Sequence, residues 1–291
     1  MRDYSYAIPI LFLLPAIGIL FFLQFVGWGW NINIVLHDVT VMNILREWQF
    51  VGLENFRETI LDPQTLTSLK NTAIYTGACV SLQLVIGTVI AYFLYRAVPR
   101  VEKFFRPIFI LPWLTSVLIA AFGWELLFST DVGLINLMLT TIGIPKIDFF
   151  GGSVTAMVSI IVANTWWGTP FTILFIGSGM TSISPQLVEV SKIDGASEWM
   201  FFTRVAIPML LPFIVMDIVL TTVWTFNGYA LILEMTGGGP LNATRVLPLH
   251  AYLAAFESGD FSYGAAITIF SVVITLILVY FYFRVADIEM V

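Results

Sequence analysis

The sequence predicts an all-α protein that crosses a membrane six times. The 291-residue chain is 58% hydrophobic and only 11% charged, whereas a typical globular chain is about 25% charged. A water-soluble domain of this size could not cover its surface with so few charges. Stretches of roughly 20 apolar residues recur along the chain, and in lipid only a helix or a closed barrel satisfies its own backbone hydrogen bonds.

Charge and cysteine content exclude several other classes. The net charge is −6, so the chain has no basic surface for nucleic acid, and we expect the lipid bilayer to be its surroundings. Cys79 is the only cysteine, which excludes an intrachain disulfide and a cysteine-built zinc site. We expect no metal site.

Six apolar stretches organise the chain as one transmembrane domain over 1–291. We expect an N-terminal span at 7–28, an external loop at 31–71 and a five-span core at 72–283. The first stretch ends in Trp28 and Trp30 rather than in a small-residue cleavage site, so we interpret it as a retained span and not a signal peptide. The predicted spans are Ala7–Trp28, Thr72–Tyr95, Pro107–Phe128, Ser153–Ser178, Ile207–Leu233 and Tyr263–Phe283.

The distribution of basic residues orients these spans. With both termini in the cytoplasm, the inside segments are richer in Lys and Arg than the outside segments, as the positive-inside rule requires. This favours an N-in, C-in topology, and the cluster between the second and third spans carries most weight. The inside residues are Arg2, Arg96, Arg100, Lys103, Arg106, Lys192, Arg204 and Arg284.

Two external segments carry a pattern. Leu53, Phe56 and Ile60 share one face of a short predicted helix that ends near Asp62, which we interpret as an amphipathic helix at the membrane interface. The loop 236–240 reads Thr-Gly-Gly-Gly-Pro, and its composition forbids helix. It is either a simple connection or a loop that touches an external partner.

The segment 179–206 is the longest predicted cytoplasmic stretch. Ser184 can cap a helix with Pro185 at its first position, and Gly195 can end it. Leu187, Val190 and Ile193 fall on one face of that helix. Ser197 can start a second short helix over 197–205, with Pro208 following. A helix, a glycine bend and another helix predict a docking site for a cytoplasmic protein.

This segment resembles the EAA loop of permease subunits of ATP-binding-cassette importers. That pattern is Glu-Ala-Ala, three residues, Gly, nine residues and an aliphatic-x-aliphatic-Pro ending. Glu189 and Gly195 stand at the matching offsets, Asp194 and Ala196 flank the glycine, and Val190-Ser191 replace the two alanines. The ending is matched by Val205, Ile207 and Pro208.

Three further stretches resemble the carbohydrate-type, or maltose and glycerol-phosphate, permease group. Residues 50–56 are similar to its FVGLxNF stretch, and 104–112 to its FFRxxxxLP entry to the third span. Residues 236–240 are similar to its TxGGP loop. Four markers in the expected order cover almost the whole chain. The six-span layout resembles the group's smaller members, without the extra N-terminal spans and large external domain of the maltose permease.

The resemblance implies a function and a set of partners. The chain would be the non-catalytic permease subunit of a binding-protein-dependent sugar importer in a prokaryotic cytoplasmic membrane. Its partners would be a second homologous permease, two ATPase subunits that bind ATP and Mg, and an extracytoplasmic sugar-binding protein. The loop 179–206 would couple to the ATPase through Glu189, Asp194, Gly195 and Ala196. Gly237, Gly238, Gly239 and Pro240 would contact the binding protein.

A neutral-sugar path needs amides, hydroxyls and aromatic rings inside the bundle. Asn164, Trp167, Gly168 and Phe171 share one helical face in the fourth span. The maltose permease has Asn, Leu, Gly and Tyr at the matching positions, and they line its sugar site. By the same comparison the candidates extend to Thr221, Trp224 and Thr225 in the fifth span and Trp113 in the third. The alternative is ordinary packing, since Gly allows close approach and Thr can bond its own backbone.

The remaining features leave two other classes open. Glu125 and Asp217 are acids in or near the hydrocarbon, which by default indicates function, and an ion-coupled secondary transporter would use them. No Lys, Arg or His lies well inside a span, which favours a neutral substrate provided that the second permease does not contribute a cation. A membrane enzyme is the third class, but His37 and His250 lie in external loops, where we expect them solvated or at the membrane interface. The chain lacks a GxxxxGK[ST] loop, so it cannot hydrolyse ATP itself.

Overall fold

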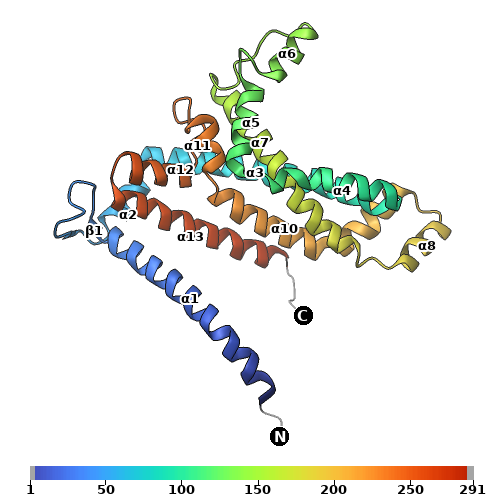
Figure 1. Cartoon of the computed structure of the whole chain (residues 1–291), viewed down its shortest axis with the longest axis horizontal. Helices are drawn as coiled ribbons and strands as arrows, with labels where there is room; N and C mark the ends of the chain where they lie inside the picture. The colour runs from blue at the N-terminus through green and yellow to red at the C-terminus, as the bar shows by residue number, and fades with distance from the viewer. Residues whose placement is uncertain (1–3, 287–291) are drawn as a thin grey trace. The chain divides into compact units, whose positions relative to one another are not determined.

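The computed structural model describes residues 4–286, with side chains described over 11–284, and the chain is mostly helical (Figure 1). In this part of the chain five helices are long and apolar enough to cross a membrane, or six if one bent pair counts as a single span. The prediction of an all-α protein is thus confirmed. Two short strands, β1 His37–Asp38 and β2 Gln49–Phe50, pair antiparallel.

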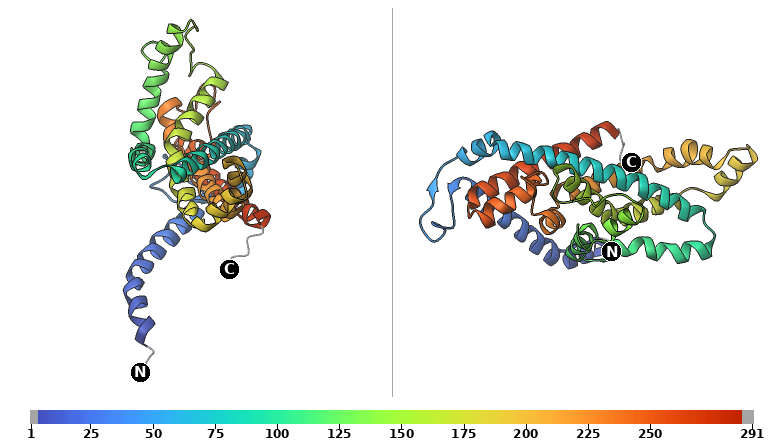
Figure 2. Two further views of the ribbon diagram at one scale, coloured as in Figure 1. Left: turned by 90° about the vertical axis from the view of Figure 1, so that its right-hand side faces the viewer. Right: turned by 90° about the horizontal axis from the view of Figure 1, so that it is seen from above.

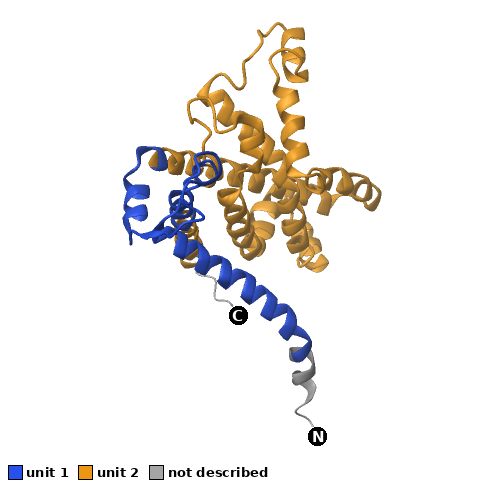
Figure 3. Ribbon diagram, turned by 60° about the vertical axis from the view of Figure 1, so that its left-hand side comes forward, with its two compact units in different colours: residues 1–65, 250–270 blue, residues 66–249, 271–291 orange. Residues whose placement is uncertain are grey.

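The chain divides into two compact units, coloured separately in Figure 3. Unit 1 comprises residues 1–65 and 250–270, and unit 2 comprises 66–249 and 271–291. Helix α13, Phe261–Ala286, contributes its first part to unit 1 and the remainder to unit 2.

Unit 1 is built on helix α1, Tyr4–Val35. From Leu11 to Val35 this helix is apolar, and its span is not buried against the rest of the chain. Only its end is packed, where Val35 joins Ala266 and Phe56 in a small core. Phe56 belongs to α2, Glu54–Leu61, so the predicted short helix is present. Its placement at the membrane interface stays a prediction.

A polar cluster closes unit 1 around Asp62. The Asp62 carboxylate accepts hydrogen bonds from the Thr65 amide at 3.0 Å and the Tyr263 hydroxyl at 2.5 Å, and His250 Nε2 lies 3.5 Å away. Burial raises the pKa of Asp62, but these hydrogen bonds and one from Gln64 outweigh burial and hold the pKa below its usual value. The expectation of a solvated or interfacial His250 is wrong, because this side chain is buried. His250 belongs to α12, Leu247–Tyr252, which continues through a π-helical turn, η2 Leu253–Glu257.

Unit 2 holds most of the apolar helices. They are α3 Pro63–Arg96, α4 Pro99–Leu114, α5 Val117–Phe128, α6 Leu134–Thr141, α7 Ser153–Met180, α10 Ile207–Asn227 and α11 Ala230–Thr236. Ile176 and Met180 of α7 pack against Leu210 of α10 and Ala91 of α3, and all four side chains are buried. Helix α3 starts at Pro63 rather than Thr72, because Asp62 caps its first turn.

The predicted third span, Pro107–Phe128, is not one straight helix, and this is a correction. Helices α4 and α5 meet at an angle of 97° (Figure 1). Pro112 has no N–H to donate to the preceding turn, and Thr115 and Ser116 take extended backbone angles. The Thr115 hydroxyl donates to the Pro112 carbonyl at 2.6 Å, which satisfies part of the broken ladder.

The predicted fifth span, Ile207–Leu233, is also divided. Helix α10 ends at Asn227, Gly228 is extended, and α11 begins at Ala230. The sequence run from 207 to 233 is apolar throughout, so hydropathy alone does not show this end. Glycine weakens the helix at this position, since it costs about 1 kcal/mol relative to alanine.

The segment 179–206 folds as a helix, a glycine bend and a second helix, as predicted. Helix α8, Pro185–Ile193, is capped by the Ser184 hydroxyl, and α9, Glu198–Phe201, by the Ser197 hydroxyl. Gly195 has a φ of +77°, a left-handed conformation that glycine adopts most readily. The second helix does not stop before Pro208, however. It runs into α10 through a π-helical turn, η1 Phe202–Ala206.

Candidate functional site

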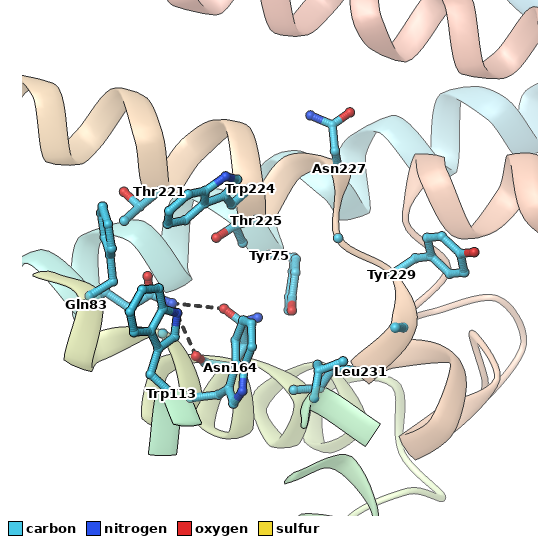
Figure 4. A pocket seen from close by; sticks show the side chains of 16 residues that line it. Tyr75, Gln83, Trp113, Asn164, Thr221, Trp224, Thr225, Asn227, Tyr229 and Leu231 are labelled. Atoms are coloured by element: carbon cyan, nitrogen blue, oxygen red, sulfur yellow. Dashed lines mark hydrogen bonds between the residues drawn. The ribbon is translucent and has the colours of Figure 1, made fainter. Parts of the chain in front are cut away.

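One cavity of about 560 Å³ opens within unit 2 (Figure 4). Its walls come from α3, α4, α5, α7, α10 and α11, so helices distant in sequence converge on it. All eight residues predicted for the substrate path line it. They are Trp113, Asn164, Trp167, Gly168, Phe171, Thr221, Trp224 and Thr225. The structure therefore brings the whole predicted set together, and its role in transport stays a prediction.

Aromatic rings form one wall of the cavity, centred on Phe171. The Trp224 ring lies edge-on to Phe171 with centroids 4.6 Å apart, and Trp113 lies 5.9 Å from the same ring. Trp224 is 52% exposed and Trp113 is 37% exposed, so apolar ring surface remains available. Such faces stack against the C–H surface of a sugar ring.

Two side-chain amides form the polar part of the cavity. Gln83 Nε2 donates to Asn164 Oδ1 at 2.9 Å and to the Asn164 carbonyl at 3.2 Å. Asn164 Nδ2 turns away from Gln83 toward the middle of the cavity (Figure 4). The Asn164 amide therefore offers its NH₂ group to the cavity, a donor that suits a hydroxyl oxygen.

The break between α4 and α5 supports the cavity wall. Thr115 follows the C-terminal end of α4, and its carbonyl has no partner within the helix. The Trp167 indole N–H donates to this oxygen at 3.2 Å. Trp167 is thus fixed by its polar atom, and its rings contribute apolar surface. The bend that hydropathy did not predict places Trp113 and Val117, from its two arms, on one cavity.

Two of the three threonines of α10, Thr221 and Thr225, line the cavity. The Thr221 hydroxyl donates to the Asp217 carbonyl at 2.6 Å, one turn earlier in the same helix. Its proton is therefore engaged, and it can offer only an acceptor to the cavity. Thr225 is buried beside it on the same lining.

Charged side chains are absent from the cavity lining over the described residues. Asp217 is buried, and its Oδ2 accepts a hydrogen bond from Thr172 at 3.1 Å, away from the lining. Glu125 also lies outside the lining. Within residues 4–286, no three His, Cys, Asp or Glu side chains gather as a metal site would require.

Sequence reasoning missed several lining residues. Gln83 and Tyr75 of α3 are buried beside the cavity, while Asn227 and Tyr229 border it at the end of α10. Gln83 could have been found, because an amide inside an apolar stretch needs a hydrogen-bond partner. Asn227 and Tyr229 depend on the end of α10, which the sequence did not reveal.

The segment 179–206 contrasts with the cavity in its exposure. Glu189, Asp194 and Gly195 are exposed, and Ala196 is half-buried. Apolar side chains next to them are exposed too, with Ile193 at 84% and Trp199 at 72%. Helix α8 lies at one end of the unit (Figure 1, Figure 2).

One ion pair ties this segment to α3. Arg96 pairs with Glu198 at the start of α9, and the Tyr92 hydroxyl donates to the same carboxylate at 2.8 Å. The rings of Tyr92 and Phe202 lie 4.6 Å apart. These contacts connect the start of α9 to the end of α3.

The glycine loop at 236–240 is folded back on itself. Thr244 Oγ1 donates to the Gly239 carbonyl at 2.7 Å, and Asn71 of α3 donates to the carbonyls of Asn242 and Arg245. Gly237 is exposed, Gly238 is buried, and Gly239 and Pro240 are half-buried. The tip of the loop is Leu241, which is 97% exposed.

Comparison with known proteins gives a consistent result. Residues 83–287 match the family described as binding-protein-dependent transport system inner membrane component. The chain is 31% identical over 277 residues to the trehalose/maltose transport system permease protein MalF of Thermococcus litoralis, covering 95% of this chain and 91% of that protein. It is 29% identical over 239 residues to the sn-glycerol-3-phosphate transport system permease protein UgpA of Agrobacterium fabrum, covering 82% and 81%.

A solved structure has the same fold. A chain of a bacterial ABC transporter involved in the import of the acidic polysaccharide alginate superposes with a TM-score of 0.84. The overlap covers 99% of this chain and 98% of that one, at 20% sequence identity. At this identity the likeness establishes the fold and not the substrate.

Proposed function

This chain belongs to the family of binding-protein-dependent transport system inner membrane components, and from that premise we propose that it forms half of the transmembrane path of an ATP-driven importer for a neutral sugar. The family is a membrane-transport family, so the chain is a permease component. The observation that carries the proposal is the cavity, whose aromatic wall and paired amides suit a polyhydroxylated ring.

The absence of charge in the lining supports a neutral substrate. A carboxylate or a phosphate is best bound next to a cation, because an unpaired charge in a low-dielectric site is costly. Over the described residues the lining has neither Lys, Arg nor His. Relatives of this chain are named for neutral and for anionic substrates, and the uncharged lining on this chain's side supports a neutral one.

The segment 179–206 supports coupling to an ATPase subunit. The exposed apolar side chains of Ile193 and Trp199 provide the kind of surface that a protein partner would cover. The exposed Glu189 and Asp194 add charge at the edge of this surface. In this proposal the segment is the EAA loop and lies in the cytoplasm. An N-in, C-in arrangement with six spans follows, the bent pair α4–α5 being the third.

The loop 236–240 supports contact with an extracytoplasmic binding protein. Its glycines build a tight turn, and its exposed tip, Leu241, offers a single apolar contact. A second homologous permease would complete the cavity, and ATPase closure would alternate its opening by rigid-body motion. ATP and Mg would bind the ATPase subunits and not this chain.

The alternative of an ion-coupled transporter has less support. Its coupling acids would be Glu125 and Asp217, and neither lines the cavity. The exposed apolar surface of 179–206 would also have no role in such a protein.

The test is co-purification in detergent of the tagged chain, expressed with its neighbouring genes, followed by mass spectrometry. We expect an ATPase and a second permease to be recovered. The variant combining Glu189→Arg and Gly195→Pro should lose the ATPase and keep the second permease. A chain that purifies alone, or one that keeps the ATPase in this variant, would contradict the proposal.

A further inference from the structure

The pair Gln83 and Asn164 shows an arrangement that a simple lining does not require. Gln83 Nε2 directs both of its protons at Asn164, one to Oδ1 at 2.9 Å and one to the main-chain oxygen at 3.2 Å. A primary amide has two donors, so the donor side of Gln83 is fully used. The side chains are buried, at 3% and 9% exposure.

This geometry determines which end of the Asn164 amide faces the cavity. An unconstrained asparagine can turn its oxygen or its nitrogen toward a ligand, because the two ends have nearly the same shape. Here Oδ1 is occupied by Gln83, so Nδ2 is the end that remains for the cavity (Figure 4).

Gly168 lies one helical turn after Asn164, against the same glutamine. A Cβ at this position would stand 2.5 Å from Gln83 Nε2 and 2.8 Å from Gln83 Cδ. Both distances are below van der Waals contact, and the atoms met belong to the far end of a flexible side chain. An alanine would therefore be accommodated by displacing the Gln83 amide from Asn164 rather than by moving the helices.

We propose that Gln83 is a positioning residue that holds the Asn164 side chain with the Asn164 NH₂ group toward the cavity. The absence of a side chain at Gly168 leaves the space through which Gln83 reaches Asn164, and the Gln83 amide occupies this space. The cavity gains a fixed donor for a sugar oxygen without the entropy cost of ordering an amide on binding. This inference rests on the proposed transport function.

The test is a double-mutant cycle on Gln83→Leu and Asn164→Leu in the complete transporter reconstituted in proteoliposomes with its binding protein. The probes are labelled maltose, trehalose and N,N′-diacetylchitobiose. We expect Asn164→Leu to raise KM about tenfold, the effect of losing roughly 1.4 kcal/mol, and Gln83→Leu to raise it several-fold with kcat unchanged. The double variant should match Asn164→Leu, because Gln83 acts through Asn164. If the KM increases of the two single variants instead multiplied in the double variant, the proposal would be overturned.

Gly168→Ala separates positioning from packing. It should reproduce the KM of Gln83→Leu. Gly177→Ala is the matched control on α7, since a Cβ there meets nothing within 4 Å, and it should transport as the original chain does. A Gly168→Ala variant with unchanged KM would contradict the positioning of Asn164 by Gln83.

A second readout does not depend on transport. Removing one partner leaves the other buried and unsatisfied, whereas removing both is less costly. The Tm of the purified complex should therefore fall with each single leucine variant, and the double variant should fall by less than their sum. If none of the three sugars is taken up, the neutral-sugar function loses support. The positioning of Asn164 by Gln83 is then tested by these Tm values alone. Additive Tm shifts would overturn it.

Discussion

The cavity and the segment 179–206 lie in the same compact unit and use their polar groups in opposite ways. In the cavity, Gln83 holds Asn164, and Trp167 is tied to the Thr115 carbonyl, so the polar groups are fixed before any ligand arrives. In the segment, Glu189 and Asp194 are exposed beside apolar side chains. The contrast indicates a preorganised binding site in one region and an interface awaiting a partner in the other.

The largest effect expected from this comparison is in the bend of the segment. Gly195→Pro would force φ to about −65° where the chain needs +77°, and the α8–α9 angle would be lost. Sugar uptake should fall to background, while membrane insertion of the chain and the Tm of the purified complex stay near normal. Gly195→Asn is the control, since asparagine tolerates this conformation. Uptake in the proline variant would show that the bend is not needed for coupling.

Two tryptophans test whether the regions are separable. Trp224→Ala removes part of the aromatic wall and should raise KM for sugar about tenfold, since ring contacts and lost burial amount to roughly 1–2 kcal/mol. Trp199→Ala removes an exposed ring from the segment and should lower the maximal rate and the ATPase association while leaving KM unchanged. The measurement is uptake against sugar concentration. If both variants changed KM equally, the division of roles would be wrong.

A smaller effect is expected at the break between α4 and α5. Trp167→Phe keeps a ring on the cavity and removes the hydrogen bond to the Thr115 carbonyl. A neutral hydrogen bond contributes about 1 kcal/mol, so KM should rise several-fold, and limited proteolysis near 115–116 should quicken. Unchanged KM and cleavage would mean that the bend is held without this contact.

The smallest effect is expected at the ion pair between Arg96 and Glu198. Glu198 is largely exposed, and exposed pairs contribute about 0–1 kcal/mol. Glu198→Gln should keep the Tyr92 contact and reduce the maximal rate by less than threefold, with Tm almost unchanged. The charge swap Arg96→Glu with Glu198→Arg should restore the rate. If it did not, the attraction between the two charges would not be what supports the rate.

Hydropathy predicted where the chain is apolar and missed where its helices break. The long helices α3, α7 and α13 follow from their apolar runs. The break at 115–116 and the early end of α10 at Asn227 do not, because proline and glycine inside an apolar stretch are tolerated in some spans and break others. At the first break the Trp167 indole of α7 donates to the Thr115 carbonyl, a tertiary contact that no local pattern contains.

The candidate site was predictable in part for the same reason. Asn164, Gly168 and Phe171 share a helical face, which periodicity reveals. Gln83 comes from a helix about 80 residues away in sequence, and only the packing of α3 on α7 brings it to Asn164. The roles of all these residues in transport stay predictions.

Uptake by the reconstituted transporter is the most direct test of the central claim. Proteoliposomes holding the complex would be loaded with ATP and given the cognate binding protein. Labelled maltose, trehalose and N,N′-diacetylchitobiose would be compared with sn-glycerol-3-phosphate and an alginate oligosaccharide. We expect ATP-dependent accumulation of at least one neutral sugar and of neither anion. Accumulation of an anion without any neutral sugar would contradict the uncharged cavity as the determinant of the substrate.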